Sequence, residues 1–245
     1  MYRERRSLVD GAVVWTHGAM PEGQGRVLPD GCMDLLLWDG ALVVAGPDTR
    51  AHLFPREAGS RMTGLRLPPG TGPLVFGVPA HELRDRRVPL VDLWPAAAVR
   101  VLEERAGEAP QKGRVLDGIA AGRLTEQSGP FPSRRAAGLL ARGRGVAAVA
   151  RELGLSERQL HRRCLDAFGY GPKTLARVLR MQDALSRAAG GTPPAEVAAV
   201  SGYADQAHLS REVKALAGVT LTELLPQGSR ANRSTPLPSG SATTA

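Results

Sequence analysis

Two short segments in the C-terminal half carry side chains that could read the edges of DNA bases. If the apolar residues of each segment face inward, Arg158 and Arg162 lie on the opposite face of the first helix, and Gln206 and Arg211 on that of the second. Arginine can donate two hydrogen bonds to guanine, and glutamine can pair with adenine. Both segments therefore have the chemistry of a DNA-reading helix.

The two segments belong to an internal repeat. The string Val-Ala-x-x-x-Gly occurs at 149–154 and again at 197–202, and each copy is followed by a capping residue, Ser156 or Asp205. The helices that follow place Leu160 and Cys164, or Leu209 and Val213, four residues apart on one face. A small residue, a turn glycine and a capped second helix predict a helix-turn-helix. We expect two such units, joined by a long helix over 172–189.

The expected DNA-contacting set follows from these faces, and Arg162 and Arg211 occupy equivalent places in the two copies. A solvated basic helix face is the alternative explanation of the same charges. The full set is Arg158, Gln159, His161, Arg162, Gln206, Ala207, His208, Ser210, Arg211 and Lys214.

Residues 145–225 resemble the AraC/XylS family of bacterial transcription regulators. The most specific match is the run from Val197 to Lys214, followed by Gly218-Val219-Thr220, and residues 156–163 match the first motif. The sequence departs from the family where Leu209, Val213 and Cys164 replace Phe and Leu221 replaces Pro. The resemblance implies a tandem helix-turn-helix domain that binds double-stranded DNA, and contact with RNA polymerase if the protein is an activator.

The first 92 residues are expected to be rich in β-strands. Strands are predicted over 12–16, 32–38, 41–45, 62–67 and 74–78, with a tight hairpin at Asp39-Gly40. The runs 28–35, 64–66, 69–70 and 77–85 resemble a sensory domain found on some of these regulators. That resemblance implies a cupin-like β-domain followed by helices that help the chain form a homodimer.

The expected architecture is α+β: a small β-barrel or sandwich, cupin-like, followed by an all-α domain with two helix-turn-helix motifs. Helices are predicted over 93–106 and 112–124, and the tail after residue 225 lacks apolar periodicity. The expected divisions are 1–92 for the β-rich sensory domain, 93–132 for a helical linker, 133–225 for the DNA-binding domain and 226–245 for a disordered tail.

The charge distribution supports a polyanionic partner for the C-terminal half. Residues 1–130 hold 16 Lys and Arg against 16 Asp and Glu, whereas the remaining residues hold 16 against 8, so the whole net charge of +8 lies after residue 130. No apolar run approaches the roughly 18 residues of a membrane span, so we expect a cytoplasmic protein without membrane contact. The abundance of Arg, Ala and Gly suggests a bacterial source.

Other chemistry has weaker signals. The two cysteines, Cys32 and Cys164, are too far apart for a disulfide framework or a multi-cysteine zinc site. We therefore expect no metal, no cofactor, no catalytic residue and no enzymatic activity.

A small-molecule effector is the expected ligand of the β-domain. In the strand 62–67, Leu65 and Leu67 share one face, so Arg66 points to the other and could hold an anionic effector. Cys32 and Asp34 complete this candidate effector pocket. A solvent-facing Arg66 is the alternative.

Two other classes of protein remain open from the sequence. One is a cupin-like, metal-dependent enzyme tethered to DNA, which would need Cys32, Asp34, His52 and His81 to converge. The other is an architectural DNA-binding protein that has no effector.

Overall fold

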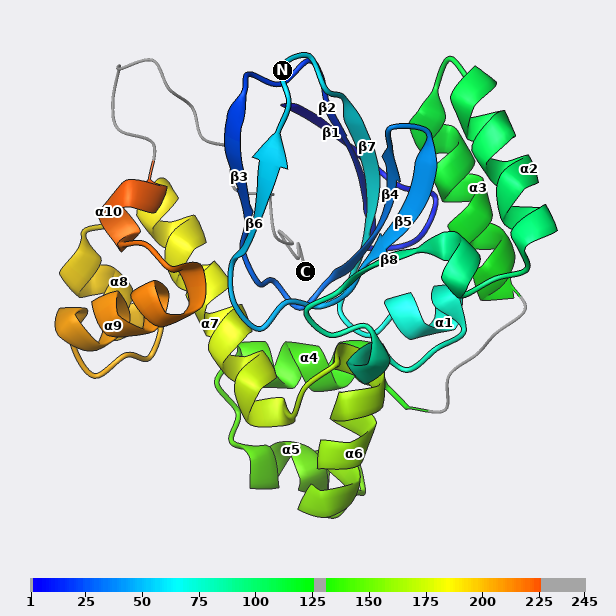
Figure 1. The fold of residues 1–245 in the computed structure, drawn as a ribbon. Coiled ribbons are helices and arrows are strands. Elements are labelled where there is room, and N and C mark those ends of the chain that lie inside the picture. The colour runs from blue at the N-terminus through cyan, green and yellow to red at the C-terminus, as the bar shows by residue number, and fades with distance from the viewer. Residues whose placement is uncertain (1, 126–130, 226–245) are drawn as a thin grey trace.

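The computed structural model describes residues 2–125 and 131–225. The expected disordered tail, 226–245, lies outside these residues. The N-terminal part forms two antiparallel sheets that face each other, and helices make up the C-terminal part (Figure 1). The expected α+β class, with a β-sandwich before a helical domain, is therefore confirmed.

The larger sheet has six strands in the order β1-β2-β7-β4-β5-β8, and the smaller pairs β3 with β6. The strands are β1 (Tyr2–Arg6), β2 (Val13–His17), β3 (Gly23–Val27), β4 (Met33–Trp38), β5 (Ala41–Ala45), β6 (His52–Arg56), β7 (Met62–Leu67) and β8 (Arg87–Pro89). The predicted Asp39-Gly40 hairpin is confirmed: both residues have positive φ, 48° and 84°, as a type I′ turn requires.

The two faces of the larger sheet have different surroundings. On the outer face, Leu35, Leu65 and Leu67 are fully buried against helices α1 (Gly72–Phe76), α2 (Ala96–Glu108) and α3 (Lys112–Thr125). On the inner face, Asp34 and Arg66 point toward the smaller sheet and line a cavity. This alternation along β7 is the one that the sequence predicted.

The predicted strand over 74–78 is wrong, because this run forms helix α1 followed by a left-handed Gly77. A short apolar run fits a strand or a buried helical turn equally well by periodicity. Pro73 at the start of the first turn decides in favour of the helix, since proline is pre-organised there.

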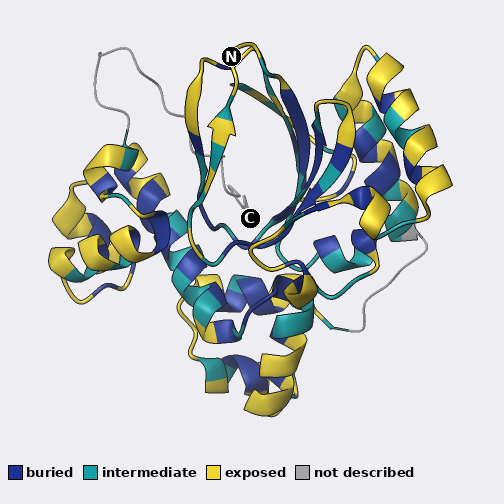
Figure 2. Cartoon of the chain, in the orientation of Figure 1, coloured by how far each residue is buried: buried dark blue, intermediate teal, exposed yellow. Residues whose placement is uncertain are grey.

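The helical part contains two cores that share one long helix. The first core lies among α4 (Ser133–Ala141), α5 (Val146–Glu152), α6 (Glu157–Phe168) and α7 (Pro172–Ala189). The second lies among α7, α8 (Pro194–Val200), α9 (Gln206–Ala217) and α10 (Leu221–Leu224). Figure 2 shows the buried residues of these cores along the inner sides of the helices. The predicted joining helix over 172–189 is confirmed.

Both helical units are docked on the β-domain. Arg84 Nη1 donates to the carbonyl of Gly169 at 3.2 Å, at the end of α6. Arg26 Nη1 donates to the carbonyl of Ala217 at 2.6 Å, at the end of α9, and the buried side chain of Leu28 belongs to the second helical core. Helices α6 and α9 are therefore attached at their C-terminal ends to the domain that holds the cavity.

Gly169→Ala is expected to destabilise the protein more than Gly154→Ala. Both glycines have positive φ, so an alanine at either position is strained by about 1–2 kcal/mol in this left-handed backbone conformation. A Cβ on Gly169 would also lie 2.5 Å from Pro47 Cγ, whereas one on Gly154 has open space. Overpacking should add roughly 1–3 kcal/mol at Gly169 alone. Thermal unfolding of both variants tests this, and equal losses would contradict the docked arrangement of α6.

Candidate nucleic-acid interface and effector pocket

The helix α6 begins at a capping box. Ser156 Oγ accepts the backbone N–H of Gln159 at 3.2 Å, and Gln159 Oε1 accepts the N–H of Ser156 at 2.8 Å. Gly154, with φ of 67°, forms the preceding turn. The side-chain carbonyl of Gln159, an expected DNA contact, is therefore engaged in the cap.

The outer face of α6 is strongly basic. Leu160 and Cys164 are fully buried, as predicted, and Arg158, His161 and Arg162 are exposed. Among residues 2–125 and 131–225, no carboxylate forms an ion pair with Arg158, Arg162 or the neighbouring Arg163. Unpaired guanidinium groups on one helix face are free to donate to phosphates or base edges.

The second recognition helix, α9, is capped by Asp205, whose Oδ1 accepts the N–H of His208 at 2.6 Å. His208 is half-buried. Its Nδ1 faces the N–H of Ala204 at 3.3 Å, and its ring meets that of Tyr203 edge to face at a centroid distance of 5.4 Å. Like Gln159 in the first unit, His208 therefore contacts the residues at the start of its own helix.

The remaining expected contacts on α9 are exposed, while Leu209 and Val213 are fully buried as predicted. Ser210 Oγ donates to the carbonyl of Gln206 at 2.9 Å. Arg211 lies six residues after the capping residue Asp205, the same distance that separates Arg162 from Ser156. The exposed set is Gln206, Ala207, Ser210, Arg211 and Lys214.

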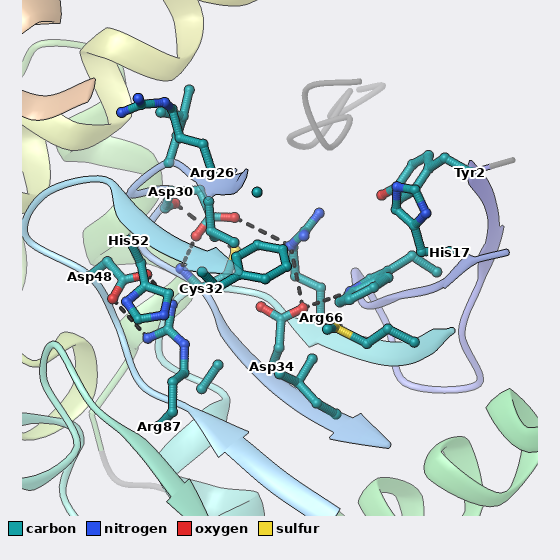
Figure 3. A pocket seen from close by; sticks show the side chains of 18 of the residues that line it. Tyr2, His17, Arg26, Asp30, Cys32, Asp34, Asp48, His52, Arg66 and Arg87 are labelled. Carbon is teal, nitrogen blue, oxygen red and sulfur yellow. Dashed lines mark hydrogen bonds and ion pairs between the residues drawn. The ribbon is translucent and has the colours of Figure 1, made fainter. Parts of the chain in front are cut away.

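Between the two sheets lies a cavity of about 340 Å³. Cys32, Asp34 and Arg66, the three residues expected to form an effector pocket, all line it (Figure 3). Sequence reasoning missed much of the wall for two reasons. Strands β1, β3, β6 and β8 were not predicted, and on the predicted strands β2 and β4 the side chains of Trp15 and Trp38 were not assigned to the cavity. The missed aromatic and polar lining includes Tyr2, Trp15, Trp38, Phe54, His52, Asp48 and Arg87.

Arg66 is the central charge of this cavity. Its Nε lies 3.3 Å from Asp30 Oδ2 and 3.7 Å from Asp34 Oδ1, and its side chain is 11% exposed. Asp34 Oδ1 also accepts the indole N–H of Trp15 at 2.7 Å. Nε and Nη1 of Arg66 are buried without a hydrogen-bond partner among the described residues. The solvent-facing alternative for Arg66 does not agree with this position.

Burial controls the protonation of the groups around Arg66. It raises the pKa of Asp34, an effect that the charge of Arg66 opposes. Burial also raises the pKa of the Cys32 thiol well above its ordinary value, and the charge of Asp30 adds to the rise. Cys32 is therefore a neutral thiol at neutral pH, and it does not have the reactivity of a thiolate.

A second buried arginine in the cavity is fully paired. Arg87 donates to both oxygens of Asp48, at 2.8 and 2.6 Å, in a two-pronged ion pair. The guanidinium of Arg87 is therefore satisfied by the protein itself, whereas Nη1 of Arg66 has no hydrogen-bond partner among the described residues.

The C-terminal helical part of the chain also contributes to the wall of the cavity. Val219, Glu223 and Leu224, from the turn before α10 and from α10 itself, line the same space as the strands. This segment directly follows recognition helix α9 and packs in the second helical core. A molecule bound in the cavity would therefore contact an element that directly follows α9.

The four residues that a metal-dependent enzyme would need do not converge. Cys32, Asp34 and His52 line the cavity, whereas His81 lies against α6 with its Nδ1 3.5 Å from Asp166. Within the described ranges, no three His, Cys, Asp or Glu side chains are grouped to hold a metal ion. The described helices include none long and apolar enough to cross a membrane.

Family models match both halves of the chain. A helix-turn-helix domain matches residues 149–227, and a domain of unknown function (DUF6597) matches residues 11–89. Comparison with curated proteins gives no match.

Solved structures of ToxT from Vibrio cholerae are similar to the chain. The wild-type structure with bound unsaturated fatty acid is 13% identical, with 89% of this chain and 96% of that chain covered and a TM-score of 0.48. The structure bound to (E)-4-(8-methylnaphthalen-1-yl)but-3-enoic acid is 11% identical, with 91% and 97% covered and a TM-score of 0.45.

The match to the helix-turn-helix family covers both capped helices, α6 and α9, and identifies the chain as a DNA-binding transcription regulator. The helix-turn-helix domain of this chain is of the AraC type, as the sequence motifs indicated.

Proposed function

We propose that the chain regulates transcription in response to a small molecule bound in the cavity between the two sheets. The observation that carries this proposal is the shared wall: α10 of the DNA-binding part lines a cavity that the β-domain otherwise forms. A ligand that contacts both parts can favour one arrangement of the second helix-turn-helix over another. The volume of the cavity, about 340 Å³, is within the range of small-molecule sites.

The chemistry of the lining favours an organic molecule with an apolar body and a hydrogen-bond acceptor. Trp15, Trp38 and Phe54 supply the apolar surface. The buried Nη1 of Arg66, which has no hydrogen-bond partner among the described residues, is the donor that such a ligand would satisfy, because a buried N–H group without a partner is costly. A carboxylic acid, ionised or neutral, offers a carbonyl oxygen that can accept a hydrogen bond from this guanidinium beside Asp30 and Asp34.

The test is a thermal-shift panel of aromatic and aliphatic carboxylic acids, followed by DNA titrations with and without each stabilising acid. Coupling between two sites typically changes affinity about 5- to 150-fold, and a change of this order is expected here. Arg66→Lys should weaken binding of the acid, whereas Arg87→Lys should weaken it less because Asp48 already satisfies Arg87. An architectural protein would show DNA affinity that no bound acid changes.

The same proposal assigns the remaining roles. We propose that Arg158, Arg162, Gln206 and Arg211 are the principal base readers, and that the protein acts in the bacterial cytoplasm, without catalysis, metal or cofactor. As an activator it would contact RNA polymerase. We also propose a homodimer through the helices that follow the β-domain, which sedimentation equilibrium would detect.

A further inference from the structure

Helix α7 is a rigid connection between the two helix-turn-helix units. Its N-terminal half places Leu175 and Val178 in the first core, and its C-terminal half places Met181 and Leu185 in the second. The two units lie at opposite ends of this helix (Figure 1). Any contact that fixes α9 against α7 therefore also fixes the position of α9 relative to α6.

An ion pair makes such a contact. Arg177, from the half of α7 that packs in the first core, reaches across to Glu212 on α9. Its Nε lies 2.8 Å from Oε2 and its Nη2 3.0 Å from Oε1, a parallel two-bond geometry that restricts orientation as well as distance. The hydrogen bonds from Arg177 lower the pKa of Glu212, so the pair is ionised at neutral pH.

Two further contacts continue the same stripe of α7. Arg180 lies over the ring of Tyr203, 5.0 Å from its centroid, and its Nη1 donates to the carbonyl of Gly202 at 3.3 Å. Asp183 Oδ2 accepts the hydroxyl of Ser201 at 2.8 Å. The residues 177, 180 and 183 recur every third position and so lie on one side of the helix. They hold both the turn and the recognition helix of the second unit.

The first unit has no equivalent of this ion pair. The position of α6 that corresponds to Glu212 is Arg163, which is exposed and has no ion-pair partner within the part of the chain that the structure describes. The pair at Arg177 is thus a feature of the second unit, where it lies next to the base-reading candidate Arg211.

We propose that Arg177 and Glu212 are positioning residues that set the separation of the two recognition helices, and with it the spacing of the two DNA segments that the protein accepts. Neither residue needs to touch a base. Two recognition helices on one face of a duplex must be separated by about one helical turn, so a small rotation of α9 changes which base pairs it meets.

The experiment uses duplexes that the full-length protein selects from a random library, in the selected form and with one base pair inserted or deleted between the two contacted segments. Wild-type affinity should fall about tenfold or more when the spacing changes, since register is lost in one segment. In Arg177→Met and Glu212→Gln, this spacing penalty should shrink to roughly threefold or less, with weaker binding to the selected site.

Arg135→Met is the control, because the ion pair of Arg135 with Glu152 at 3.1 Å joins α4 to α5 within the first unit. It should keep the wild-type spacing penalty. The double variant with the exchanged pair, Arg177→Glu with Glu212→Arg, should restore much of the spacing penalty that the single variants lose. Circular dichroism checks that each variant is folded. Variants that are folded and retain the full spacing penalty, or that weaken all spacings by the same factor, would overturn the proposal.

Discussion

Replacing Arg66 with Met is expected to lower the free energy of unfolding at pH 7 by about 3–5 kcal/mol, the usual cost of removing one partner from a buried ion pair. Asp30 and Asp34 both lie within 4 Å of the Arg66 Nε, and all three side chains are less than a fifth exposed. Without the guanidinium, two carboxylates face each other in the cavity with no cation between them. Chemical denaturation of wild type and variant measures the difference.

This deficit is expected to shrink as the pH falls. Burial raises the folded-state pKa of Asp34 above the ordinary value of 3.8, and Arg66 opposes that rise. A raised folded pKa means that ionisation of Asp34 costs stability, and this cost appears as pH rises from 3.8 through the folded pKa. Removing Arg66 raises that pKa further, so the variant loses more stability than wild type over a wider window above 3.8.

The measurement compares the two proteins from neutral pH down to about pH 4, close to the intrinsic pKa of an aspartic acid. Arg187→Met serves as the reference, because it removes an ion pair that is nearly half exposed on both sides. A deficit that stays constant over this range would show that Arg66 does not interact with an ionised Asp34.

The helical half could be predicted closely from local signals. Apolar residues four apart, such as Leu160 and Cys164, placed the buried face, and Ser156 and Asp205 marked the helix starts. These signals act within one or two helical turns, so no distant part of the chain is needed to interpret them. The hairpin at Asp39-Gly40 could be predicted for the same reason.

The walls of the cavity could not be predicted in this way. Strand β1 is rich in charge, β3 is rich in glycine and β6 contains Pro55, so none has the alternating apolar pattern of a half-buried strand. Strands β3 and β6 also pair only with each other, from Gly23 opposite Arg56 to Val27 opposite His52, so neither has a partner that is its neighbour along the chain. The alternation along β7 predicted the side of the sheet to which Arg66 points. The positions of its carboxylate partners, Asp30 and Asp34, are known only from the folded structure.

The candidate DNA interface shows a similar limit. Exposure of Arg162 and Arg211 followed from periodicity, because opposite faces of a helix are fixed by its pitch. The contacts of Gln159 and His208 at the starts of their own helices could not be predicted from periodicity. A side chain that caps a helix and one that contacts a base can have the same spacing. The sequence also contained no sign of the Arg177–Glu212 pair, whose members are 35 positions apart.

Arg162→Ala and Arg211→Ala are each expected to weaken binding to a selected duplex by about 1–3 kcal/mol, or roughly 5- to 150-fold, while binding to random duplex barely changes. Both arginines are exposed, lie six residues after a helix cap and belong to helices with a buried opposite face. Each is placed to enter its own segment of the major groove, where base contacts add to a phosphate contribution that every sequence supplies.

Lys214 provides the contrast within the same helix. It lies in the last turn of α9 and is exposed, a position suited to the DNA backbone rather than to base edges. Lys214→Ala should weaken binding to selected and random duplexes alike, and should reduce the slope of affinity against salt by about one.

Titration of these three variants on the selected and the random duplex is the most direct test of the claim that α6 and α9 read DNA bases. The structure predicts losses confined to the selected duplex for both arginine variants, and a uniform loss for the lysine variant. Equal losses on both duplexes for Arg162→Ala and Arg211→Ala would show that these side chains contact phosphates, and would contradict the assigned recognition faces.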